Sequence, residues 1–187
     1  MEHYKLSPII MNKKTLSKCF AIVFVMLSLH LFSQEKEESC KHFRISPVLS
    51  HTYIPTATSE GTQTIIVPSI GLDLEYWFSP KFGLGLHNDL ELFNYEIEKP
   101  GEELTVEREY PVVVTLDGLA KVYEDLVVVF GTGVEFEKRQ NLFIVRAGLE
   151  YEIEFAEHWD LSPTFFYDYR HNEFGTWSMG IGVGRRF

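Results

Sequence analysis

The stretch TIIVPSIGLDLEYWF at residues 64–78 alternates in chemical character from one residue to the next. Ile70, Leu72 and Tyr76 fall on one side of this alternation, and Asp73 and Glu75 fall on the other. Successive side chains of a β-strand point to opposite faces, so the stretch predicts a strand with one apolar and one polar face. A helix would instead repeat its apolar positions every three or four residues.

The same two-residue period recurs along the rest of the chain and gives eight predicted strands. These lie at residues 43–54, 64–78, 82–92, 108–122, 126–137, 143–155, 161–170 and 177–187. Ser79, Pro80 and Lys81 mark a tight turn after the second strand. Neighbouring strands can all pair as hairpins, and an even number brings both ends of the sheet to the same side.

Alternation alone leaves open which face is inside. A soluble barrel or sandwich buries the apolar face, whereas a membrane barrel turns it towards lipid and fills the interior with polar and small residues. Here the polar face is rich in charge and in glycine, which would only weaken a solvent-facing strand. The inward glycines of the membrane interpretation are Gly131, Gly133, Gly148, Gly180, Gly182 and Gly184.

Aromatic residues of the apolar face gather at the strand ends, as they do where a membrane meets water. One predicted girdle comprises Tyr76, Phe78, Phe82, Phe155, Trp159 and Phe187. The other comprises Tyr53, Tyr110, Phe136, Phe143, Tyr169 and Trp177. The turns near 79–81, 123–125 and 156–160, all on one side, are short. On the other side the loops at 55–64 and 93–107 are long, although those near 138–142 and 171–176 are not. We therefore predict an all-β, eight-stranded antiparallel up-and-down transmembrane β-barrel; a soluble periplasmic barrel is the alternative.

The first residues have the features of an export signal. Basic residues 12–18 precede an apolar run at 19–32, and Ser33 is a small residue before a polar start. An N-terminal membrane anchor is the alternative, although the run is shorter than the roughly 20 residues that a spanning helix needs. The predicted organisation is an extension with signal peptide (1–33), a short polar segment (34–42) and the barrel (43–187).

Composition excludes several classes of function. The chain has 187 residues, with 17 Lys and Arg against 27 Asp and Glu, and a net charge of −10. This acidic balance argues against nucleic-acid binding, which requires a basic surface. Two cysteines are too few for a disulfide scaffold or a four-thiolate zinc site.

The last strand, TWSMGIGVGRRF at 176–187, alternates and ends in an aromatic residue. With this strand, the chain resembles the small eight-stranded outer-membrane β-barrel proteins of diderm, or Gram-negative, bacteria over nearly its whole length after the signal. The resemblance implies an outer-membrane location and contact with lipids and lipopolysaccharide. It also implies insertion by a machinery that reads Trp177 and Phe187. Members of this class include anchors, adhesins, enzymes and narrow channels, so no activity is implied.

The predicted interior carries many charges that must be paired, since an eight-stranded barrel is just wide enough to be filled by side chains. The predicted lumen network contains Asp73, Glu75, His87, Asp89, Glu91, Glu135, Arg146, Glu150, Glu152, Asp168 and Arg170. Further inward charges are Arg44, Asp117, Lys121, Glu137, Glu154 and Arg186. Hairpin geometry predicts that Asp73 faces His87 and that Glu135 faces Arg146.

From these features we predict a non-enzymatic, monomeric structural or surface-interacting protein with a charge-plugged lumen and no cofactor. Because inward acids outnumber inward bases, a narrow cation-leaky channel is the first alternative. His87, Asp89 and Glu91 have a spacing that could hold a metal, but a hydrogen-bonded network is the favoured interpretation, so no metal is predicted. A lipid-modifying enzyme would need a triad such as Ser178, His171 and Asp168, and is disfavoured. The acidic loop 96–109 is expected to be solvated.

Overall fold

The computed structural model describes residues 42–58, 61–98, 105–171 and 173–187. The predicted signal peptide and nearly all of the polar segment after it lie outside these residues. No helix in the described part of the chain is long and apolar enough to cross a membrane.

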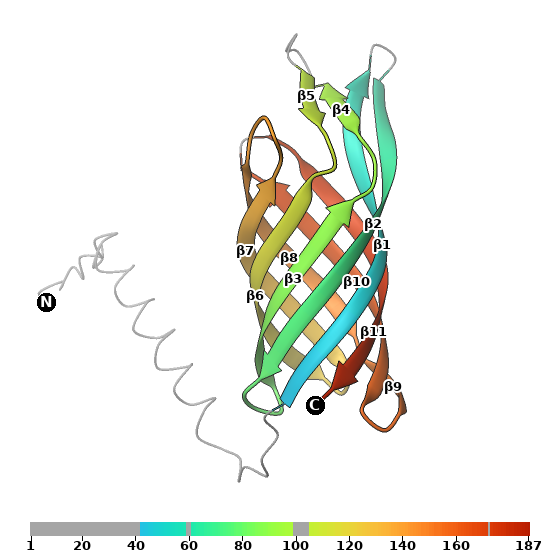
Figure 1. Ribbon diagram of the computed structural model, residues 1–187, viewed down its shortest axis with the longest axis vertical. Helices are drawn as coiled ribbons and strands as arrows, with labels where there is room; N and C mark the ends of the chain where they lie inside the picture. The colour runs from blue at the N-terminus through green and yellow to red at the C-terminus, as the bar shows by residue number, and fades with distance from the viewer. Residues whose placement is uncertain (1–41, 59–60, 99–104, 172) are drawn as a thin grey trace, which may run out of the picture. The chain divides into compact units, whose positions relative to one another are not determined.

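The described residues form eleven strands, joined mostly as antiparallel hairpins (Figure 1). The strands are β1 (His42–Thr58), β2 (Gly61–Trp77), β3 (Phe82–Glu91), β4 (Tyr95–Glu98), β5 (Thr105–Arg108), β6 (Val112–Tyr123), β7 (Leu126–Phe136), β8 (Leu142–Tyr151), β9 (Ile153–Ala156), β10 (Trp159–Arg170) and β11 (Gly175–Arg186).

Eight wall positions close into a barrel. We call each one a stave; it consists of one strand, except that β8 and β9 together form one stave. The order runs β11-β1-β2-β3-β6-β7-β8-β10, and β10 pairs with β11 to complete the circle. β9 also pairs with β10 and continues the stave of β8 after a break at Glu152. The amide of Phe187 donates to the carbonyl of Phe43 at 2.8 Å, so the two ends of the sheet meet at one rim. We call this rim the lower end. The predicted eight-stranded fold is confirmed.

Two segments predicted to be loops contain paired strands instead. β1 and β2 pair from His42↔Trp77 to Thr58↔Gly61, so most of the predicted 55–64 loop extends this hairpin. β4 and β5 form a separate two-stranded sheet within the predicted 93–107 loop. Both hairpins rise above the barrel in Figure 1. The sequence prediction missed them because their strands do not continue the lipid-facing apolar pattern.

The predicted strand at 108–122 is also wrong at its beginning. Arg108 ends β5, and β6 starts only at Val112. Tyr110 between them has a φ of 45°, a left-handed conformation that breaks a strand, and Pro111 has no amide to donate to a neighbour. This break separates the barrel wall from the hairpin above it.

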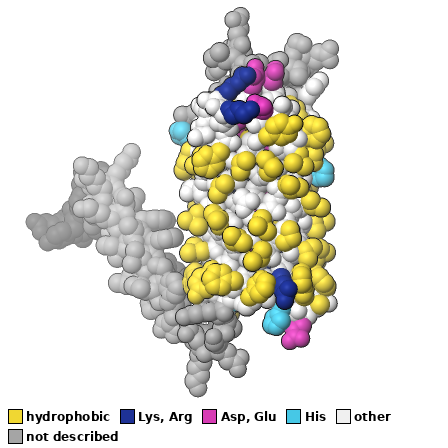
Figure 2. Space-filling view, in the orientation of Figure 1, with side chains coloured by type: hydrophobic (Ala, Val, Ile, Leu, Met, Phe, Trp, Pro, Cys, Tyr) yellow, Lys and Arg dark blue, Asp and Glu magenta, His cyan; other side chains and the backbone are white. Residues whose placement is uncertain are grey.

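The apolar face of the wall points outward. Along β10 every second residue is buried, and the buried ones include Asp160, Ser162 and Thr164. Large apolar side chains are exposed around the barrel, for example Leu49 at 70% and Leu116 at 61%. On the face shown in Figure 2, hydrophobic side chains cover the wall and charged ones lie near its two ends. A soluble protein does not expose such a surface, so the soluble alternative is wrong.

The aromatic girdles are largely present. Nine of the twelve predicted members are exposed: Tyr76, Phe155, Trp159, Phe187, Tyr110, Phe136, Phe143, Tyr169 and Trp177. Tyr53, Phe78 and Phe82 are half-buried. Tyr53 lies opposite Trp177 across the β1–β11 seam, and the Tyr76 ring packs 4.8 Å from the ring of Phe43 at the lower end. These rings mark the two levels at which the barrel crosses from lipid to water.

Candidate functional site

The inward face of the barrel holds a dense set of charged side chains. Of the eleven residues predicted for the lumen network, ten are buried and Asp89 is half-buried. Glu154 departs from the inward prediction, since its side chain is 59% exposed beyond the break at Glu152. Sequence reasoning missed Asp160 and Arg108, both of which are buried. Asp160 lies on the polar side of its strand, but Arg108 gave no signal because its segment was assigned to the wrong strand.

Arg44 is the centre of the lower charge cluster. Its Nη1 contacts Glu75 and lies 2.8 Å from Glu150, and its Nη2 lies 2.6 Å from Asp160. Nη2 also donates to Ser162 at 2.7 Å. These acceptors come from β2, β8 and β10, so a single guanidinium ties together three staves on different sides of the lumen. An arginine suits this position because its planar fork offers five donors.

Two pairs fill the middle of the lumen. Nδ1 of His87 lies 2.7 Å from Asp117, which also accepts a hydrogen bond from Thr115 at 2.6 Å. Arg146 binds both oxygens of Asp168, at 2.7 and 2.8 Å, and these two residues face each other across β8 and β10. Bidentate pairs of this kind are the strongest and most directional of side-chain ion pairs.

The upper cluster is built around Glu135, which contacts two arginines. Arg170 donates to Glu135 from Nε and to Thr176 from Nη1 at 2.8 Å. Arg108 approaches Glu135 at 3.0 Å, from the segment just above the barrel. Glu135 therefore connects the wall to the β4–β5 hairpin.

One of the two predicted cross-strand pairs agrees with the register and the other is wrong. Gly71↔Asp89 and Leu74↔Leu86 are partners, which places Asp73 across from His87. Glu135, however, lies opposite Leu142, and Arg146 lies opposite Gly131. The hairpin of β7 and β8 is centred between Lys138 and Arg139, two residues earlier than predicted, and this shifts the pairing by four residues.

Apolar layers lie within the same interior. One cluster combines Trp77, Leu119, Val127, Val129 and Phe166. Its Trp77 Nε1 donates to Glu75 at 2.8 Å, and Arg146 lies over the Phe166 ring at 4.9 Å. A second cluster combines Ile54, Val67, Tyr95, Ile97, Leu142 and Phe174, from the upper hairpins and the upper rim. Charged and apolar layers of side chains thus alternate along the barrel axis.

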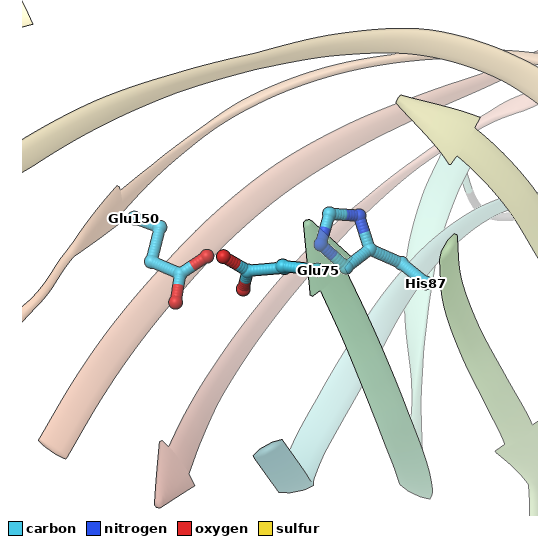
Figure 3. Close-up of side chains that lie close together, drawn as sticks. All are labelled: Glu75, His87 and Glu150. Carbon is cyan, nitrogen blue, oxygen red and sulfur yellow. The ribbon is translucent and has the colours of Figure 1, made fainter. Parts of the chain in front are cut away.

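Among the described residues, one group has the geometry to hold a metal ion: Glu75, His87 and Glu150. One ligand atom from each lies within 4.8 Å of the other two, and Figure 3 shows the three side chains converging. This group differs from the spacing considered in the sequence, since Asp89 lies beside Arg146 at 3.2 Å and Glu91 lies 3.6 Å from Arg170. The ligands come from three strands, so linear spacing could not reveal them.

The residues weighed for an esterase-like triad are not assembled. Asp168 uses both carboxylate oxygens to bind Arg146 inside the lumen. His171 is exposed in the turn beyond β10. Ser178 lies opposite Phe166 rather than opposite His171. A nucleophile, its base and an orienting carboxylate must lie within hydrogen-bond reach, which these three side chains do not.

A polar cleft of about 470 Å³ lies beside the β4–β5 hairpin and the turn after β7. Its lining includes Tyr95, Glu96, Glu107, Arg108, Glu137 and Arg139. Arg139 pairs with Glu107, and its amide donates to Glu137 at 2.8 Å. Although partial burial favours the neutral form of Glu137, the backbone amides around it and Arg108 hold the pKa of this carboxyl below its usual value.

No protein-family model matches the chain, and no curated protein matches it in sequence. Solved structures do match in fold. Ail, the attachment invasion locus protein of Yersinia pestis, in complex with the heparin analogue sucrose octasulfate, has a TM-score of 0.53 at 13% identity, covering 79% of this chain and 99% of that one. OprG of Pseudomonas aeruginosa gives 0.52 at 16% identity, over 80% and 97%. Neisserial surface protein A gives 0.52 at 11% identity, over 78% and 97%.

These similarities concern the fold, and the fold agrees with the physical features of the wall. The chain is a closed eight-stranded barrel with an apolar, aromatic-bounded exterior and a charged interior. All backbone hydrogen-bonding groups of such a wall are satisfied within a closed sheet, as hydrocarbon requires. The protein is therefore a small transmembrane β-barrel of the outer-membrane type.

Proposed function

We propose that this protein is a non-enzymatic component of the outer membrane, with a sealed lumen and an upper surface that serves a structural or interacting role. The observation that supports the proposal is the set of buried ion pairs and apolar side chains inside the barrel. Arg44, Arg146 and Arg170 each bind acids on other strands and are at most 1% exposed. An ion crossing the barrel would have to break such pairs.

The two apolar clusters support closure because a charged solute would lose its hydration on passing them. In the apolar cluster around Trp77, the side chains of Trp77, Val129 and Phe166 are each no more than 5% exposed. The second apolar cluster, near the upper rim, packs Tyr95 and Ile97 of the β4–β5 hairpin against Ile54 and Val67. The upper hairpins thereby form a packed cap, which supports a role as an interaction surface.

The partners of the protein follow from its location in the outer membrane. The exposed wall would contact outer-membrane lipids, with lipopolysaccharide in the leaflet nearer the upper hairpins. The last strand, with Trp177 and Phe187 exposed on the lipid side, would present the insertion signal to the assembly machinery. The sulfated ligand in the Ail structure is a poor guide here. Arg108 and Arg139 at the upper cleft are already paired with acids, so little free positive charge is left for a polyanion.

Planar-bilayer recording tests whether the lumen is sealed. The folded full chain is expected to give no conductance steps above the lipid background. A double variant, Trp77→Ala with Phe166→Ala, removes the two largest side chains of the apolar cluster around Trp77 and should introduce a small leak, which shows that the recording senses the lumen. Cation-selective steps in the unmodified protein would instead establish the narrow-channel alternative. Lipid hydrolysis that is lost in His171→Ala would establish an enzyme.

A further inference from the structure

His87 projects from β3 into the middle of the lumen and is fully buried. Its Nδ1 is used by Asp117, whereas its Nε2 has no hydrogen-bond partner among the described residues. A carboxylate can only accept, so Asp117 keeps the proton of the neutral imidazole on Nδ1 and leaves a lone pair on Nε2. In Figure 3 the free side of the ring faces the carboxylates of Glu75 and Glu150.

The position of the imidazole is built by its surroundings. Thr115 holds the same oxygen of Asp117 that contacts His87, and the Phe166 ring lies 5.9 Å from the imidazole. Gly85 leaves the space that the ring occupies, since a Cβ there would lie 2.9 Å from Nε2. A carboxylate that orients a histidine in this way is the usual outer support of a metal-binding imidazole.

The two glutamates complete the ligand set. One imidazole nitrogen and two carboxylate oxygens suit zinc and its neighbours among the divalent transition metals. Such ions bind these atoms at about 2.0–2.2 Å. The three atoms lie within 4.8 Å of one another, so modest side-chain rotations bring them around one ion.

Buried acids outnumber buried arginines in the lumen, which favours a bound cation there. The buried acids of the described residues number nine and the buried arginines four. The acids are Asp73, Glu75, Glu91, Asp117, Glu135, Glu150, Glu152, Asp160 and Asp168, and the arginines are Arg44, Arg108, Arg146 and Arg170. Half-buried Lys121 and Arg186 reduce this excess without removing it.

Arg44 approaches both glutamates and would repel a cation at close range, and it also binds a third acid. Its Nε and Nη2 bind Asp160, so only Nη1 is shared between Glu75 and Glu150. Glu75 also accepts a hydrogen bond from Trp77. Each carboxylate oxygen has two lone pairs, so both glutamates can keep these contacts and still bind an ion.

We infer that Glu75, His87 and Glu150 form a buried site for a divalent transition-metal ion such as Zn²⁺, with Asp117 as the positioning residue that orients His87. The ion would join β2, β3 and β8 across the lumen, so its role is structural. Because the site is enclosed, the ion enters as the barrel folds.

Cobalt(II) is the probe that tests this site, since its visible spectrum reports the ligand geometry. The full chain, without a histidine tag, is refolded in detergent with Co²⁺ and then freed of unbound metal. We expect about one Co²⁺ per folded barrel with a ligand-field band, and no band when excess Zn²⁺ is present during refolding. His87→Gln and Glu150→Gln should abolish the band. Asp117→Asn should weaken binding about 10- to 100-fold.

His171→Gln is the matched control, because it removes an exposed histidine outside the lumen and should leave the band unchanged. Mobility of unboiled samples in a detergent gel verifies that each variant has folded, so a loss of metal cannot be attributed to a loss of the barrel. Folded protein that retains no stoichiometric Co²⁺ would overturn the inference, as would a folded His87→Gln variant that binds it equally well.

Discussion

Removing the guanidinium of Arg44 should destabilise the barrel more than any other single change of a charge. The substitution Arg44→Met keeps most of the apolar stem but leaves Glu75, Glu150 and Asp160 without their shared partner. All of these side chains are at most 4% exposed. Breaking a buried ion pair from one side costs about 3–5 kcal/mol, because the remaining charge stays buried. We expect a loss of unfolding free energy of that size.

The assay is reversible urea unfolding in lipid vesicles, followed by tryptophan fluorescence. Arg139→Met is the control, since this arginine side chain is 67% exposed and pairs with a partly exposed Glu107; such pairs contribute about 0–1 kcal/mol. Adding Asp160→Asn to Arg44→Met should recover part of the loss, because contacting residues couple by about 0.5–3 kcal/mol. If Arg44→Met costs no more than Arg139→Met, the buried pairs do not hold the staves together.

Three further changes test the wall and the upper turn. Leu116→Arg places a charge on the lipid face and should cost about 2–4 kcal/mol in the same unfolding assay, whereas Glu157→Arg in a lower turn should be nearly neutral. Gly133→Val should prevent closure, because a Cβ would lie 2.0 Å from the carbonyl oxygen of Val114, while Gly118→Val meets nothing nearer than 3.6 Å; gel mobility of unboiled samples reports the difference. The folded protein holds the pKa of Glu137 below its usual value, so its carboxylate stabilises the fold at neutral pH and loses this effect as the pH falls through the lowered pKa. Glu137→Gln should therefore destabilise the protein at pH 7 but not at a pH below that lowered value, and equal destabilisation at both would contradict the assignment.

The sequence was sufficient to predict the strands of the barrel wall, because each wall residue faces one of two very different surroundings. Lipid accepts only apolar side chains, and the narrow lumen accepts small or paired polar ones, so strands such as Leu126–Phe136 carry an unambiguous period of two. The upper hairpins escaped prediction for the complementary reason. β4 and β5 lie outside the lipid level, where one face packs on a small apolar cluster and the other meets water, so their four-residue strands leave a weak pattern.

The sequence by itself determined the class of this protein, the eight-stranded wall of the barrel and most of the side chains that point inward, because alternation is a local property of the extended backbone. The tertiary structure alone decided the partners of those inward side chains. Arg44 binds Asp160, 116 residues away, and His87 meets Glu75 and Glu150 from two other strands. Such contacts depend on strand order, on the shear of the closed sheet and on the position of each turn along the chain, as the four-residue shift of Glu135 from Arg146 illustrates.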